Sequence, residues 1–124
     1  MDSTINTIEK AFIADGTDIK LMPDVSHLKR EKDQQAIINN YKADVVIRAL
    51  NSEGQEKEWE PDYSDPSQIK YENWYVFSPS SGWSLLNVVI WHAHTRSCSR
   101  RAFRTRAIAR YFAETFPELV NAIL

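Results

Sequence analysis

Three stretches of the chain carry apolar residues at intervals of three and four, the spacing that places side chains on one face of a helix. The first stretch has its apolar face at Ile5, Ile8, Ala11 and Phe12. Asn6 followed three residues later by Glu9 matches a helix-capping pair, in which each side chain bonds a free amide of the first turn. Gly16 can end the helix in the left-handed backbone that glycine tolerates, and a turn-rich connector follows around Pro23.

The second stretch, from about Glu31 to Asn51, contains neither glycine nor proline and predicts a long helix. Its apolar face is formed by Ile37, Ile38, Tyr41, Val45, Ala49 and Leu50. Polar side chains fall mostly on the opposite side, as expected for a helix with one face in water. Gly54 is the expected stop.

The third stretch follows Thr105, whose hydroxyl can cap the first turn of a helix. Its apolar positions are Ala107, Ile108, Tyr111, Phe112, Thr115, Phe116, Leu119, Val120 and Ile123. Pro117 lacks an amide hydrogen, so it should kink this closing helix or restart it.

Between the second and third helices the chain is rich in aromatic and β-branched residues, which favour strands. Tyr71 to Phe77 and Trp83 to His92 flank the turn sequence 78–82, so the two segments are predicted to pair as a hairpin. A third strand is expected at about Ser99 to Arg104. Apolar side chains occur on both sides of the first strand, which indicates either helices on both faces or a surface for a partner.

Helices and strands therefore occur in blocks, which is typical of the α+β class. We predict two N-terminal helices, a small three-stranded antiparallel sheet (the hairpin plus one strand), and a C-terminal helix packed on the sheet. The acidic segment 53–68 contains Trp59 and Tyr63, which should pin it as an ordered loop. Residues 1–124 are thus interpreted as one domain.

The composition, with 43% apolar and 26% charged residues, is ordinary for a globular protein. A single cysteine, Cys98, excludes an internal disulfide and any zinc site built from several cysteines. The longest apolar run, around Leu85 to Trp91, is too short for a membrane span, and residues 1–4 lack the pattern of a signal peptide. We expect a cytoplasmic protein without membrane contact.

Charge is distributed unevenly along the chain. Residues 1–73 hold nine Lys and Arg against fifteen Asp and Glu, a net charge of −6, whereas residues 74–124 hold six against two, a net charge of +4. The six positive residues of the second part are Arg96, Arg100, Arg101, Arg104, Arg106 and Arg110. Because arginine grips phosphate or carboxylate through paired hydrogen bonds, this segment indicates an anionic partner.

The competing interpretation of the arginine segment is a solvated polar face with local ion pairs. Arg110 and Glu114 lie one helical turn apart and could pair in this way. Nucleic acid is one form that an anionic partner could take. Against it stands the overall pI of about 5.9, since nucleic-acid-binding domains are usually basic as a whole.

His92 and His94 are the candidates for metal binding, because alternate residues of a strand point to the same side. A metal would need a further ligand from elsewhere, and a polar strand surface is the simpler explanation. Neighbouring arginines favour the thiolate of Cys98, but catalysis would also need a base. Asp62 and Asp65 form a carboxylate pair that turn capping explains equally well. We expect no enzyme activity and no cofactor.

The stretch Trp59-Glu60-Pro61-Asp62-Tyr63-Ser64-Asp65, continued by Gln68-x-Lys70-Tyr71-x-x-Trp74, has an order and spacing that chance rarely produces. With these motifs and Ser81-Gly82-Trp83, the chain resembles a family of small uncharacterised proteins of gut anaerobic bacteria, their phages and mobile elements. The resemblance covers nearly the whole chain. It implies a single-domain fold in a phage or mobile-element setting, and it implies no catalytic residue. Cys98 and Arg101 depart from the family pattern, which weakens any family-wide role for them.

We predict a small non-enzymatic accessory protein of a phage or mobile element that acts as a protein-binding module. Its contact face would lie on the hairpin and third strand, with candidate contacts at His92, His94, Arg96, Arg100, Arg101 and Arg104. The alternative is a nucleic-acid-binding protein that uses the Arg96 to Arg110 segment. A metal enzyme built on the two histidines and a structural part of a virion are further alternatives, and self-association is also expected from the uneven charge.

Overall fold

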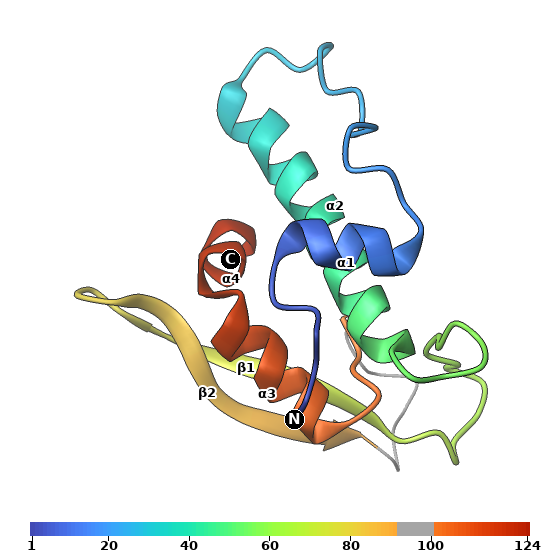
Figure 1. Ribbon diagram of the computed structural model, residues 1–124. Coiled ribbons are helices and arrows are strands. Elements are labelled where there is room, and N and C mark those ends of the chain that lie inside the picture. The colour runs from blue at the N-terminus through green and yellow to red at the C-terminus, as the bar shows by residue number, and fades with distance from the viewer. Residues whose placement is uncertain (92–100) are drawn as a thin grey trace.

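The structure, a computed structural model, describes residues 1–91 and 101–124. Its elements follow in the order α1 (Ile8–Asp15), α2 (Glu31–Ser52), β1 (Lys70–Ser78), β2 (Gly82–Trp91), α3 (Arg106–Thr115) and α4 (Pro117–Ile123) (Figure 1). Two N-terminal helices, an antiparallel hairpin and C-terminal helices packed on that hairpin make an α+β fold, as predicted.

The first helix begins one residue later than predicted. The hydroxyl of Thr7 accepts a hydrogen bond from the backbone amide of Lys10 at 3.1 Å, so Thr7 is the N-cap. Asn6 instead accepts a hydrogen bond from Nζ of Lys10 at 2.9 Å. Thr7 has the extended backbone that a cap requires (φ −136°, ψ 160°), and the prediction of Asn6 as the cap is therefore wrong. Gly16 ends the helix with φ 77°, as expected.

The second helix has a buried half and an exposed half. Its buried residues lie from Ala43 onwards, whereas Ile37, on the predicted apolar face, is 44% exposed. In Figure 1 the N-terminal half of α2 extends beyond the other elements, and α1 packs across the helix further along. The apolar periodicity thus predicted the helix correctly, but the core covers only its C-terminal half.

The hairpin is antiparallel, with Tyr71 opposite Ile90 near one end and Phe77 opposite Trp83 near the turn. The register shifts once between these pairs, because Leu86 is an extra residue on β2. Such a bulge increases the local twist of the strands and redirects the side chain of the extra residue.

The predicted third strand is reduced to a single bridge in the part of the chain that the structure describes. Phe103 pairs with Tyr71 through two backbone hydrogen bonds of 2.8 and 3.0 Å, and no further pairing with β1 follows among residues 101–104. Residues 99–100, where this strand was expected to begin, lie outside the described residues. The described sheet therefore has two strands rather than three.

Asn51, near the end of α2, bonds the side of this segment that faces away from β1. Its carboxamide donates to the carbonyl of Ala102 at 3.0 Å and accepts from the backbone amide of Arg104 at 2.8 Å. These groups point away from β1, because neighbouring residues of an extended segment turn their backbone groups to opposite edges. Residues 102–104 are thus held between β1 on one side and α2 on the other.

The C-terminal helical segment restarts at Pro117 instead of bending there. Thr105 caps α3 as predicted, because its hydroxyl accepts from the backbone amide of Ile108 at 3.1 Å. Phe116 leaves the helical conformation (φ −120°, ψ 53°), and Pro117 then occupies the first turn of α4, where a missing amide hydrogen costs nothing.

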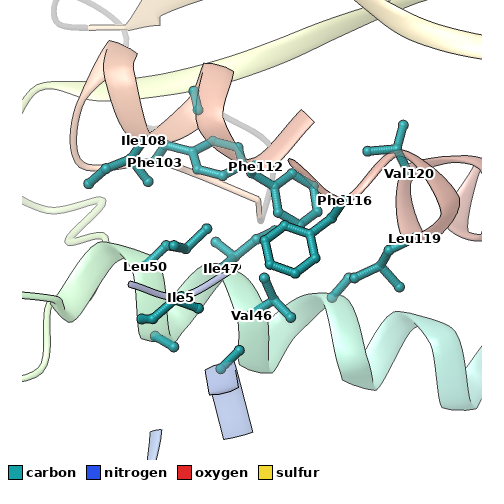
Figure 2. Close-up of a cluster of buried hydrophobic side chains, with 14 of the residues drawn as sticks. Ile5, Val46, Ile47, Leu50, Phe103, Ile108, Phe112, Phe116, Leu119 and Val120 are labelled. Carbon is teal, nitrogen blue, oxygen red and sulfur yellow. The ribbon is translucent and has the colours of Figure 1, made fainter. Parts of the chain in front are cut away.

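The core lies between α2, the two C-terminal helices and the inner face of the hairpin (Figure 2). The rings of Phe103 and Phe116 flank Phe112, with centroids 5.7 and 6.0 Å away. The N-terminal segment joins this core through Ile5, which is 3% exposed and whose carbonyl accepts a hydrogen bond from the hydroxyl of Tyr111 at 2.8 Å. Within residues 1–91 and 101–124, no helix is long and apolar enough to cross a membrane.

Candidate partner-binding surface

Helices cover only one face of the hairpin in the described structure (Figure 1). The side chains that point towards them, including Tyr71, Tyr75, Trp83 and Leu85, pack against the core. We call this the inner face and the opposite one the outer face. Of the two sequence-based alternatives for this doubly apolar hairpin, helices on both faces are not what the described residues form, and a surface for a partner stays a prediction.

The outer face presents large apolar side chains to solvent. Trp74 is 51% exposed, Val76 is 43% exposed, and Leu86 at the bulge is 62% exposed. The sequence contains no Asp, Glu, Lys or Arg between Glu72 and Arg96. Exposed strands are usually protected by charged side chains, and after Glu72 this hairpin has none. An uncharged apolar face of this kind is typical of a binding surface.

The free edge of β2 is bonded by side chains at several points. Asn121 of α4 accepts from the backbone amide of Trp83 at 2.8 Å and donates to its carbonyl at 3.1 Å. Further along, the carbonyl of Val88 accepts from Arg106 at 2.9 Å, and its amide donates to the side chain of Asn87 at 2.9 Å. A new strand would have to displace these contacts to pair with β2.

The free edge of β1, beyond its bridge to Phe103, lacks side-chain hydrogen bonds of this kind from the described residues. Tyr71 turns its amide and carbonyl towards Phe103, and alternation along a strand turns those of Asn73, Tyr75 and Phe77 to the same side. No hydrogen bond from the described part of the chain reaches the backbone of these three residues on that side. This edge is therefore open in the described structure.

A cavity of about 180 Å³ lies beside the open edge of β1. Its lining residues are Glu72, Asn73, Tyr75, Arg101, Phe103, Ile123 and Leu124. Burial raises the pKa of the Tyr75 hydroxyl, more than the hydrogen bond from Asn73 and the charge of Arg101 lower it. The cavity is thus a mainly apolar recess in which Tyr75 stays protonated at neutral pH.

The candidate contacts Arg101 and Arg104 make bonds within the chain. Arg101 donates to the side chain of Asn40 and lies 3.9 Å from the carboxylate of Asp44. Nε of Arg104 donates to the backbone carbonyl of Asn51 at 2.7 Å. Both arginines therefore join residues 101–104 to α2, a role that the sequence did not reveal.

The other described arginines of the segment, Arg106 and Arg110, also make contacts within the chain. The guanidinium of Arg106 lies over the ring of Tyr71, 5.6 Å from its centroid, in addition to its bond to Val88. Arg110 lies 3.5 Å from Glu114, and this exposed pair confirms the predicted local contact. The remaining candidates, His92, His94, Arg96 and Arg100, lie outside the described residues, as does Cys98. The nucleic-acid alternative stays a prediction that depends on Arg96 and Arg100.

The stretch that carries the family resemblance folds into a loop that bonds to itself. Asp62 and Asp65 each accept hydrogen bonds from the hydroxyl and amide of the serine two positions later, and these bonds lower the pKa of both carboxyls. Gln68 donates to the carbonyl of Glu60 at 3.0 Å and accepts from the amide of Asp62 at 2.6 Å. Turn capping is thus the role of the two aspartates, as the simpler interpretation predicted.

Lys70 is fully buried and contacts two residues of this loop. Its ammonium donates to the carbonyl of Gln68 at 3.1 Å and lies 5.5 Å from the centre of the Tyr63 ring. Among the described residues no group of three or more His, Cys, Asp or Glu is arranged to hold a metal. The motif therefore supports the loop structure and the entry into β1.

Three asparagines make hydrogen bonds between elements that the sequence analysis did not predict. Asn51, Asn121 and Asn73 each use a carboxamide to bond the backbone of another element, in the last case the carbonyl of Ala109 at 2.8 Å. Their positions in a predicted strand or helix carried no sequence signal for these contacts.

Comparison with family models, with curated proteins and with solved structures found no match. Function must therefore be inferred from the geometry of the chain itself.

Proposed function

We propose that this chain is a non-enzymatic protein-binding module whose contact surface is the outer face of the hairpin. The observation that carries the proposal is the exposure of Trp74, Val76 and Leu86 on a strand pair that has no charged residue after Glu72 and whose inner face is covered by helices. The phage or mobile-element setting implied by the family resemblance is part of the proposal.

The chemistry of this surface defines the kind of partner. Trp74 is the natural anchor, because tryptophan is enriched among the residues that dominate binding energy at interfaces. Beyond Glu72 the outer face carries no charge, so a partner that buries this part gains most by presenting an uncharged apolar surface of its own, since an unpaired charge would lose its hydration. Burial of apolar area stabilises such a contact by about 25 cal/mol per Å² before the costs of association.

The proposal also revises the contact residues expected from the sequence. Arg101 and Arg104 are assigned to the junction with α2 and not to the contact face, because both are bonded to α2 residues. His92, His94, Arg96 and Arg100 lie outside the described residues and stay candidate contacts on the evidence of the sequence.

The test compares partner capture by three versions of the tagged protein. The double variant Trp74→Ser with Leu86→Ser removes the apolar side chains from the outer face. The matched control, Ile13→Ser with Leu21→Ser, removes two side chains that are 80% and 72% exposed elsewhere. We expect proteins captured from host lysate by the wild type to be retained by the control and lost by the hairpin variant.

Thermal unfolding of both variants checks that the fold is kept, since all four positions are solvent-exposed. Identical captured proteins for the hairpin variant and the wild type would contradict the proposed surface. Loss of capture in both double variants would show that general surface hydrophobicity, and not the outer face, is responsible.

A further inference from the structure

We draw no further inference here: the strongest candidate, the mainly apolar cavity of about 180 Å³ between β1 and the end of α4, carries nothing, because Arg101, which helps to line it, is bonded within the chain, the residues just before Arg101 lie outside the described structure, and nothing in the described residues shows what would occupy the cavity.

Discussion

At the scale of single residues, the carboxamide of Asn51 connects α2 to a segment that is distant in sequence. The residue is 3% exposed and its side chain makes two hydrogen bonds to the backbone of residues 102–104. Its carbonyl accepts a third hydrogen bond, from Nε of Arg104. A buried backbone group that loses its partner retains the full cost of its lost hydration.

Asn51→Ala should therefore lower the free energy of unfolding by about 2–3 kcal/mol, because two backbone groups lose buried partners. Urea unfolding followed by tryptophan fluorescence measures the change. Asn39→Ala on the same helix is the matched control, since it removes the same group from a half-buried position away from residues 102–104. The control should stay within about 0.5 kcal/mol of the wild type, and equal effects of the two substitutions would contradict the assigned role.

Asp15 is a second residue whose contacts predict a measurable effect. Burial raises the pKa of its carboxyl, but the hydrogen bonds from Arg48 and Thr17 outweigh burial and leave the pKa below the usual 3.8. Arg48 bonds both carboxylate oxygens, at 2.8 and 2.7 Å. Such a paired geometry is stronger than a single exposed ion pair.

Because the folded carboxyl holds its proton less tightly than the unfolded one, Asp15 stabilises the fold above about pH 4, and this contribution is lost as pH falls through the lowered pKa. Asp15→Asn should reduce the loss of stability between about pH 5 and 2 relative to the wild type. Urea unfolding at several pH values tests this. An unchanged pH slope in Asp15→Asn would show that other carboxyls account for acid unfolding.

At the scale of elements, the contact between the hairpin turn and α4 depends on Gly82 and Asn121. Gly82 has φ 76°, and a Cβ placed there would lie 2.5 Å from Oδ1 of Asn121. That oxygen is the acceptor for the amide of Trp83. The turn thus needs glycine both for its backbone angle and for the approach of α4.

Gly82→Ala and Gly54→Ala form a matched pair that separates these two requirements. Gly54 has the same φ of 76°, but a Cβ placed there would have no neighbouring atom within 4 Å. Gly54→Ala should cost about 1 kcal/mol for the left-handed backbone alone. Gly82→Ala should cost clearly more, because it also displaces the Asn121 carboxamide, and thermal unfolding of both variants measures the difference. Equal costs would mean that α4 adjusts freely.

The elements also show what the sequence could and could not predict. Apolar spacing identified α1 and α2, and strand-forming residues around a turn sequence identified the hairpin. Pro117 was expected to kink or restart the last helix, and the structure shows the restart. In place of the third strand, residues 102–104 make one bridge to Tyr71 on one side and bond the carboxamide of Asn51, about fifty positions earlier in the chain, on the other. A long-range side-chain contact of this kind leaves no periodic signal.

At the scale of the whole molecule, three of the arginines that give residues 74–124 their positive charge have structural roles. Arg101, Arg104 and Arg106 are drawn into contacts with α2 and the hairpin, so these arginines join elements that are distant in sequence. The apolar pattern of the hairpin indicated either helices on both faces or a surface for a partner, and the partner surface stays a prediction. The open β1 edge could not be predicted, because it depends on which side chains reach the backbone of each strand.

The hydrogen bond between the Tyr111 hydroxyl and the carbonyl of Ile5 joins residues 106 positions apart. Phe112, Phe116 and Val120, which fill the centre of the core, are likewise synthesised after α1, α2 and the hairpin. A nascent chain therefore exposes the apolar faces of α2 and the hairpin until α3 and α4 have followed, since both pack against those helices. During that interval the inner face of the hairpin is uncovered, so pairing of its apolar strands with other chains competes with folding.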